Sequence, residues 1–316
     1  MKNKNLEHIA GINKLRKDKN AIILAHYYQT GDIQDIADFV GDSLALSQKA
    51  AANTADIILF AGVKFMAETA KILAPEKKVL LPDLNAGCSL ADSCNADDFK
   101  KFLDENPGRT VVTYVNTSAE IKALSDIICT SSNAVQIVES LPADEKIIFA
   151  PDRNLGNYVL NKTGRDIIVW NGACHVHEEF SLEAIINLRK ENPDAKVIVH
   201  PECELPVRMV ADFIGSTSAL LAYSREDKAS TFIIATEAGI IHQMQKANPH
   251  KHYIPVPPKD STCGCSECNF MKLISIEKIL RCLENESPEI ILDNDIIEKA
   301  GKPIHRMMEI SKKLVI

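Results

Sequence analysis

Short runs of apolar, β-branched residues alternate with helical patterns along most of the chain. Continuous apolar runs of strand length between helices are typical of parallel sheets that are buried on both faces. Three of these strands resemble one another and start at nearly equal intervals, at residues 21–29, 109–116 and 195–202. The pattern therefore predicts an α/β protein that is built from a repeated unit.

Two further sets of strands follow. The second set starts at Asp56, Asp126 and Asp212, and the third set starts at Lys77, Lys146 and Thr231. The first repeat departs from the others, because a helix-like stretch at residues 33–52 separates its first two strands. An alternative is one large doubly wound sheet with accidental spacing.

The simplest interpretation is three pseudo-symmetric α/β domains, with boundaries near Leu103 and Arg189. Each would hold a parallel sheet between two layers of helices, and the three would surround a central cavity. The predicted domains are residues 1–103 with an N-terminal helix, residues 104–189, and residues 190–316 with C-terminal helices.

Each strand of the first set ends in two polar residues at positions i and i+2, which share one face of a strand. These pairs are His26 with Tyr28, Tyr114 with Asn116, and His200 with Glu202. Ligands bind at the carboxyl ends of parallel strands. A single such residue could be a solvated loop residue or a helix cap, but three equivalent pairs predict an active site.

Composition narrows the class of protein. Hydrophobic residues make up 46% and charged residues 25% of the chain, as in ordinary globular proteins. The net charge of −7 argues against nucleic-acid binding, which needs a basic surface. No apolar run has the length of a signal peptide or a membrane span, so we expect a cytoplasmic protein. Dinucleotide, P-loop and serine-hydrolase motifs are absent from the sequence.

The nine cysteines add candidate chemistry. In a reducing cytosol they should be thiols. Cys88, Cys174 and Cys268 follow the repeat interval, and each lies past a strand end and before a helix-like segment. One thiol per repeat would suit a [4Fe–4S] cluster with one open iron, which can act as a Lewis acid.

Zinc is the competing interpretation, and the spacing alone does not decide between the two metals. Cys263, Cys265 and Cys268 form a CxCxxC that could be half of a zinc site, although a matching second pair is missing. Cys203, beside Glu202, is ambiguous. The remaining cysteines have no polar neighbours and are expected to pack in the core: Cys94, Cys129 and Cys282.

Several segments in a specific order resemble the quinolinate synthase family. They span residues 21–308 and include AHYYQ, FAGVKFMAETAKIL, LPDLNAGCSLADSC, APDRNLG, VHPEC, GSTSALL and the terminal cysteines followed by NFMK. The resemblance implies three pseudo-symmetric α/β domains and a [4Fe–4S] cluster ligated by Cys88, Cys174 and Cys268. It also implies that Cys263 and Cys265 are additional thiols.

The reaction that the resemblance implies is condensation of iminoaspartate with dihydroxyacetone phosphate. The products would be quinolinate, phosphate and water, in de novo NAD biosynthesis. Loss of hydroxyl groups needs a Lewis acid, and imine formation needs proton donors and acceptors such as His and Glu. A transient contact with L-aspartate oxidase, which would hand over the imine, is the protein partner that the pathway suggests.

The resemblance also implies roles for single residues. His26 and Tyr28 would face the substrate, with Tyr28 as a proton carrier near the open iron, while Tyr27 would pack. His200 and Glu202 would form the general acid/base pair. The other substrate-binding residues would be Ser43, Tyr114 (also a possible acid or base), Asn116, Ser131, Ser216, Thr217 and His177, the last near the cluster.

Other function classes stay open from the residues alone. A cluster-dependent hydro-lyase would share the open iron but would not need donors for phosphate. A non-catalytic iron or redox sensor would not need acid–base groups at strand ends. A structural zinc protein would lack the colour of an iron–sulfur cluster.

Overall fold

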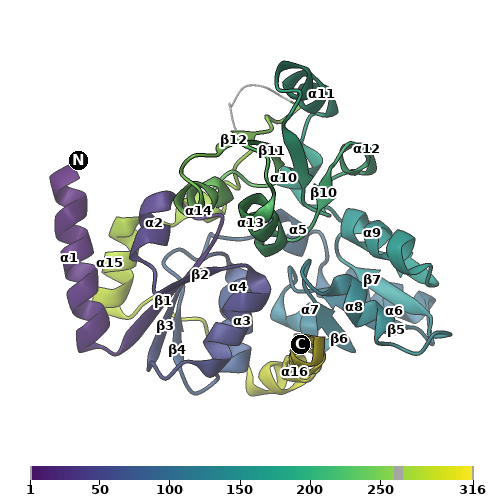
Figure 1. Ribbon diagram of the computed structural model, residues 1–316. Helices are drawn as coiled ribbons and strands as arrows, with labels where there is room; N and C mark the ends of the chain where they lie inside the picture. The colour runs from purple at the N-terminus through teal and green to yellow at the C-terminus, as the bar shows by residue number, and fades with distance from the viewer. Residues whose placement is uncertain (1, 260–265, 315–316) are drawn as a thin grey trace. The chain divides into compact units, whose positions relative to one another are not determined.

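The structure is a computed structural model that describes residues 2–259 and 266–314. In the described residues the strands form three four-stranded sheets with the same relative strand order (Figure 1). The first sheet, in the order β2-β1-β3-β4, contains β1 Ala21–His26, β2 Phe39–Gly41, β3 Ile57–Ala61 and β4 Lys78–Leu80.

The other two sheets repeat this arrangement. The second, in the order β6-β5-β7-β8, contains β5 Thr110–Tyr114, β6 Ile127–Cys129, β7 Ile147–Ala150 and β8 Ile167–Val169. The third, in the order β10-β9-β11-β12, contains β9 Lys196–Val199, β10 Phe213–Ile214, β11 Thr231–Ala235 and β12 His252–Pro255. The parallel pairing and the common strand order confirm the predicted α/β class with three related sheets.

The strand register aligns the repeats residue by residue. Counted along the chain, the first strand of each sheet pairs in parallel with the third: β1 with β3, β5 with β7 and β9 with β11. The last paired residues are Ala25 with Ala61, Thr113 with Ala150, and Val199 with Ala235. The residue that follows in the first strand is therefore equivalent in the three repeats: His26, Tyr114 and His200. The polar pairs of the sequence pattern do occupy matching positions at the carboxyl ends of their sheets.

Some strands differ from the prediction. β1 ends at His26, and residues 27–29 form a turn rather than the end of a strand. β2 lies inside the stretch 33–52 that the pattern assigns to a helix, between α2 Gly31–Ile36 and α3 Ser43–Ala52. Counted along the chain, the strand after Asp56 (β3) is the third strand of the first sheet, whereas the strand after Asp126 (β6) is the second strand of the second sheet. The two strands are therefore not equivalent.

The chain divides into two compact units. Unit 1 comprises Met1–Pro107, Val115–Ile128 and Asn269–Ile316, and unit 2 comprises Gly108–Tyr114 and Cys129–Cys268. The first sheet belongs to unit 1 and the third to unit 2. The three predicted domain ranges stay a prediction.

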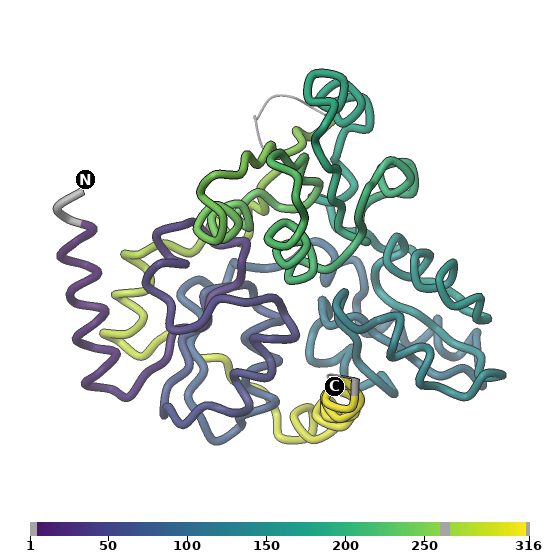
Figure 2. Tube along the Cα trace, in the orientation of Figure 1, coloured from purple at the N-terminus to yellow at the C-terminus, as the bar shows by residue number. Residues whose placement is uncertain are grey.

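In unit 1 the first sheet lies between two layers of helices. α1 Lys2–Asp18 and α15 Ile276–Asn285 contact each other and cover one face, and Figures 1 and 2 show these distant segments side by side. α3 and α4 Lys64–Leu73 cover the other face. The remaining helices of unit 1 are α5 Ser89–Asp92, α6 Ala96–Glu105, α7 Ala119–Ala123, η1 Met271–Leu273 and α16 Asn294–Leu314.

In unit 2 the third sheet has the same layered build. α13 Thr217–Glu226 and α14 Ile240–Ala247 pack together and contact β10 and β12, whereas α11 Leu182–Glu191 contacts β11. The core includes the buried Val197, Val199 and Ile233. The other helices of unit 2 are α8 Ala134–Glu139, α9 Arg153–Thr163, α10 His175–Glu178 and α12 Leu205–Met209.

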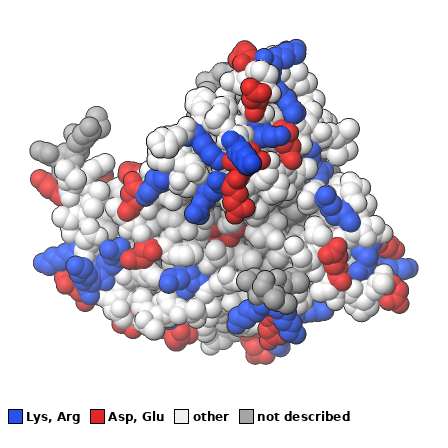
Figure 3. Space-filling view, in the orientation of Figure 1, with Lys and Arg blue, Asp and Glu red and all other residues white. Residues whose placement is uncertain are grey.

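The surface carries both signs of charge. On the face that Figure 3 shows, Lys and Arg side chains are interspersed with Asp and Glu side chains. Among the described helices, none is both long and apolar enough to cross a membrane.

Candidate active site

A buried group of polar side chains surrounds Glu202, which lies in the turn after β9 and is 2% exposed. The Tyr114 hydroxyl donates a short hydrogen bond to Oε1 of Glu202. Nδ1 of His177 lies 2.9 Å from Oε2 of the same carboxylate. Both carboxylate oxygens are thus bonded to side chains that can themselves lose or gain a proton.

The neighbouring side chains shift the pKa of Glu202. Burial alone would raise it, because a charge is poorly solvated inside a protein. The electrostatic effect of His177 and His200, together with the hydrogen bonds from His177 and Tyr114, outweighs burial and lowers the pKa to about 2. Glu202 is therefore a carboxylate at neutral pH, and both of its oxygens accept hydrogen bonds from ionisable side chains.

His200 is oriented by its own turn. The backbone N–H of Glu202 donates to Nδ1 of His200 over 3.4 Å. The neutral ring therefore carries its proton on Nε2, which lies 3.2 Å from Oγ of Ser131. The rings of His200 and His177 lie 4.6 Å apart, centroid to centroid. His200 thus presents a proton donor beside a proton acceptor.

Cys174 joins the same group. Its Sγ lies 3.2 Å from Nδ1 of His177, whose Nε2 lies 3.1 Å from Oγ1 of Thr236. The ligand atoms of Cys174, His177 and Glu202 all lie within 4.8 Å of one another. A thiol, an imidazole and a carboxylate at this spacing could hold a metal ion.

Each of the three predicted cluster cysteines lies in the loop after the fourth strand of its sheet. One backbone hydrogen bond recurs in all three loops: Lys64 N–H to Ala86 O (2.7 Å), Arg153 N–H to Gly172 O (2.8 Å) and Ala238 N–H to Ser266 O (3.2 Å). The donor comes three residues after the last paired residue of the third strand, and the acceptor comes two residues before the cysteine. Cys88, Cys174 and Cys268 are therefore equivalent in their repeats, and all three are half-buried.

Two buried carboxylates support these loops in unit 2. Asp152 accepts a hydrogen bond from the backbone N–H of Cys174, and Glu237 accepts one from the N–H of Cys268, each over 3.2 Å. In unit 1 the equivalent residue is Val63. Burial and the charge of Glu202 raise the pKa of Asp152. The sequence reasoning missed both acids. Each lies two residues past a strand end, and polar residues near strand ends were the signal that predicted the active site.

In unit 1 the turn after β1 repeats the arrangement seen at His200. The backbone N–H of Tyr28 donates to Nδ1 of His26 over 3.2 Å, and the two rings meet edge to face at 4.5 Å. Lys272 Nζ donates to the carbonyl of Tyr28, and Gln34 Nε2 donates to the carbonyl of Tyr27. Tyr27 itself is half-buried. The turn is therefore held by side chains from outside it.

Asn116 lies in a second anchored loop of unit 1. The buried Nζ of Lys122 donates to the carbonyls of Val115 (2.8 Å) and Thr117, on either side of Asn116. Oδ1 of Asn116 is itself buried, and within the described part of the chain it has no hydrogen-bond partner. A buried acceptor without a partner is unfavourable unless a ligand satisfies it.

The structure thus brings six predicted residues into one group in unit 2: Tyr114, Ser131, Cys174, His177, His200 and Glu202. Ser216 instead caps α13, with Oγ accepting the N–H of Ala219, and the buried Thr217 begins that helix. Ser43 begins α3. Cys263 and Cys265 lie outside the described residues.

The other described cysteines are buried. Burial raises the pKa of Cys94 and of Cys282 to about 12, and it also raises that of Cys129. Cys203 is buried too; its thiol donates to the carbonyl of Ala235 over 3.4 Å, and burial raises its pKa. Protonated thiols of this kind are poor metal ligands.

Three sheet repeats with an equivalent cysteine loop in each, and buried ionisable side chains at strand ends, are features of an α/β enzyme. The family model described as "Quinolinate synthetase A protein" matches residues 10–309. The chain belongs to this family, and its function is that of a quinolinate synthase in NAD biosynthesis.

Curated relatives carry the same description over nearly the full length. The quinolinate synthase of Thermosynechococcus vestitus is 58% identical over 306 residues, which cover 97% of this chain and 96% of the relative. That of Microcystis aeruginosa is 59% identical over 300 residues, covering 95% and 94%. That of Gloeothece citriformis is 60% identical over 301 residues, covering 95% and 93%.

Proposed function

We propose that the chain condenses iminoaspartate with dihydroxyacetone phosphate to form quinolinate, phosphate and water, with a [4Fe–4S] cluster held by Cys88, Cys174 and Cys268. The observation that carries the proposal is the backbone hydrogen bond that recurs two residues before each of these cysteines. It supports one thiol per repeat, with Cys268 as the thiol of the third.

The donor set fits such a cluster. Thiolates are the preferred ligands of iron–sulfur clusters, and Nδ1 of His177, at 3.2 Å from Sγ of Cys174, can stabilise the thiolate form. When bound through three thiolates, the cluster supplies one open iron that acts as a Lewis acid toward hydroxyl groups. A zinc ion on Cys174, His177 and Glu202 is the second candidate, because their ligand atoms lie close together.

Glu202 is the proton acceptor of the proposed reaction. It is held as a carboxylate, and the proton that it accepts can pass to or from Oη of Tyr114 or Nδ1 of His177. His200 is the proton donor, through Nε2–H, with Ser131 as the hydroxyl that the proton faces in the absence of substrate. Acid and base thus sit two residues apart on one turn.

The unit 1 residues bind substrate. Tyr28 carries a proton at its hydroxyl, and the backbone bond to Nδ1 leaves Nε2 of His26 as the proton-bearing nitrogen. Oδ1 of Asn116 accepts from an N–H or O–H of the intermediate, which satisfies its missing partner. The hydroxyls that donate to phosphate or carboxylate groups are those of Ser43, Ser131, Ser216 and Thr217.

The setting of the reaction is the cytoplasm, because thiol ligands need a reducing compartment. Iminoaspartate hydrolyses readily in water, since imines do so in general. A transient complex with L-aspartate oxidase would deliver it directly.

The decisive experiment is anaerobic purification followed by assay with both substrates. We expect a brown protein with about four irons per chain that forms quinolinate. A colourless protein that contains zinc would overturn the cluster. An intact cluster without product would overturn the substrates.

Single cysteine variants test the ligand set. We expect Cys88→Ala, Cys174→Ala and Cys268→Ala each to lose iron and product. The matched controls are Cys203→Ala, which removes a buried protonated thiol, and Cys263→Ala; both should keep the iron. Loss of iron from Cys263→Ala, with Cys268→Ala unaffected, would show that the wrong terminal thiol is assigned.

A further inference from the structure

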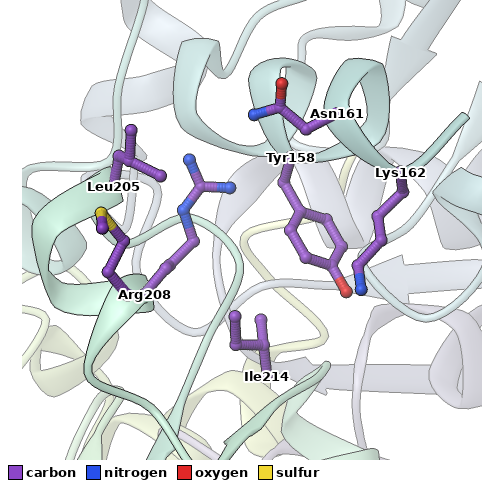
Figure 4. Close-up of a pocket in the computed structure, with 7 residues that line it drawn as sticks. Tyr158, Asn161, Lys162, Leu205, Arg208 and Ile214 are labelled. Carbon is purple, nitrogen blue, oxygen red and sulfur yellow. The ribbon is translucent and has the colours of Figure 1, made fainter. Parts of the chain in front are cut away.

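A pocket of about 300 Å³ lies on unit 2, away from the group around Glu202. Side chains of α9, α12 and β10 line it, among them Tyr158, Asn161, Lys162, Leu205, Arg208 and Ile214 (Figure 4). This volume is at the lower end of the range for small-molecule sites. None of these residues has a part in the proposed reaction.

The feature that marks this pocket is the guanidinium of Arg208. The residue is only 6% exposed, and its Nε is buried without a hydrogen-bond partner. Its side chain makes no ion pair or hydrogen bond with any residue in the described ranges 2–259 and 266–314. A buried cation is normally paired, because an unpaired charge pays a large desolvation penalty.

The immediate surroundings of Arg208 do not neutralise it. The guanidinium lies over the ring of Tyr158, at 5.6 Å from the centroid, and Figure 4 shows it beside that ring. Burial lowers the pKa of Arg208, as expected for a cation that is poorly solvated. A cation–π contact contributes only about 0.5–2 kcal/mol, which is less than a paired carboxylate supplies.

The rest of the lining sets the chemistry of a ligand. Lys162 adds a second positive charge, with Nζ at 5.7 Å from the centroid of the Tyr158 ring, and no acidic side chain lines the pocket. Leu205 and Ile214 are apolar, and Leu205 is exposed. A ligand must therefore carry a negative charge at one end and an apolar body at the other.

We propose that this pocket binds a small organic acid, with its carboxylate on the guanidinium of Arg208 and its apolar or aromatic body against Tyr158, Leu205 and Ile214. A planar carboxylate can take two parallel N–H bonds from guanidinium. An aromatic body can pack against the half-buried ring of Tyr158. This site is separate from the catalytic group, and the proposal does not depend on the substrates or the cluster proposed above.

Benzoate, benzamide and inorganic phosphate are suitable probes, measured by isothermal titration on the anaerobically purified chain. We expect saturable one-to-one binding of benzoate, and binding of benzamide and of phosphate that is at least about tenfold weaker. Benzamide that binds as well as benzoate would remove the role of charge. Phosphate that binds as well would remove the role of the apolar wall.

Variants locate the binding. Arg208→Met should weaken benzoate at least about tenfold, with quinolinate formation within about twofold of the parent chain. Arg208→Lys should keep part of the affinity, because it keeps the charge but not the planar fork. Arg225→Met removes an exposed arginine of unit 2 and should leave benzoate binding unchanged. If Arg208→Met binds benzoate as tightly as the parent chain does, benzoate binds at another site, such as the catalytic site. That result would overturn the proposal.

Thermal unfolding gives an independent readout. Benzoate should raise the melting temperature of the parent and not that of Arg208→Met. Without benzoate, Arg208→Met should melt no lower than the parent, because the substitution removes an unpaired buried charge. A clearly lower melting temperature would mean that Arg208 is already satisfied in the ligand-free chain, which contradicts the proposal.

Discussion

In unit 1 the buried charges of Lys122 and Glu68 are bonded to the main chain, whereas in unit 2 the buried carboxylate of Glu202 is bonded to side chains. Lys122 donates to two carbonyls, and Glu68 accepts the N–H of Ala119 over 3.1 Å. Glu202 accepts from Tyr114 and His177. A main-chain partner has no proton to exchange near neutral pH, but an imidazole or a phenol does.

The pKa values differ in the same sense. Burial lowers the pKa of Lys122 to about 8 and raises that of Glu68, because their partners only partly offset the lost solvation. Burial also opposes the charge of Glu202, but the two histidines reverse the outcome and lower its pKa to about 2. The imidazoles and hydrogen bonds around Glu202 therefore outweigh its burial, whereas Lys122, Lys64 and the N–H of Ala119 do not outweigh the burial of Glu68. Lys122 and Glu68 hold a loop, whereas Glu202 is bonded to side chains that can exchange protons.

The largest expected effect is that of Glu202→Gln. The amide cannot accept a proton, so turnover should fall by about 10²–10⁴-fold. Iron content and the denaturation midpoint should stay close to those of the parent, because Gln has the same shape. The measurement is the rate of quinolinate formation under anaerobic conditions, with iron determined on the same sample. Near-normal turnover would remove the proton-transfer role, and loss of iron would make Glu202 a metal ligand instead.

Lys122→Met should act on stability rather than on chemistry. The substitution removes the Lys122 donor from two carbonyls, although that of Val115 still accepts the N–H of Thr117 over 2.8 Å. It also removes one of the two cations near Glu68, which keeps Lys64 at 3.7 Å, and should cost about 3–5 kcal/mol. The check is a shift of the urea midpoint, with the double variant Lys122→Met/Glu68→Gln recovering part of it. A large loss of turnover at unchanged stability would contradict the structural role and place Lys122 in the reaction.

The sequence predicted the repeat but misplaced the second strand of the first repeat. The signal was present: ADFVG at residues 37–41 matches ADFIG at residues 211–215. Asp38 Oδ2 accepts the N–H of Ile23, and Asp212 Oδ2 accepts the N–H of Val197, both over 2.8 Å. Strands of two or three residues have no periodicity to detect, and only pairing with a distant strand makes them strands.

The polar pairs at the strand ends were predicted for a reason that is only partly right. Alternation along a strand would place His200 and Glu202 on one face, but β9 ends before them and a turn follows. The N–H of Glu202 folds back onto the ring of His200, and the N–H of Tyr28 does the same at His26. Geometry of this kind belongs to the folded turn and leaves no trace in hydrophobic patterning.

Asp152 and Glu237 test whether the cysteine loops of unit 2 differ from the loop of unit 1, where Val63 stands at the same position. Asp152→Ala removes the cap at the N-H of Leu155 and the bond to the N–H of Cys174, and should cost about 2–4 kcal/mol. Glu237→Ala should cost about 1–3 kcal/mol. Both variants should lose iron to a chelator faster than the parent.

Val63→Ala is the matched control for these loops. It removes apolar contact but no hydrogen bond, so iron should leave at the parent rate. Equal chelator sensitivity in all three variants would mean that the loops respond to any packing defect and that the carboxylates have no special role.

The smallest expected effect concerns a partly exposed carboxylate, Glu286, which accepts hydrogen bonds from Lys19 and Lys78. These bonds lower its pKa from the ordinary 4.5 to about 2. Because the folded pKa is the lower one, the stabilisation is fully present above pH 4.5 and is lost as the pH falls from 4.5 toward 2. Solvent screens the pair, so the difference in melting temperature between the parent and Glu286→Gln should be small at neutral pH, and it should close in acid and in high salt. A melting-temperature difference that persists under both conditions would show that the packing of the Glu286 side chain matters here. It would also show that a charge paired at the surface contributes far less to stability than the buried charges of either unit.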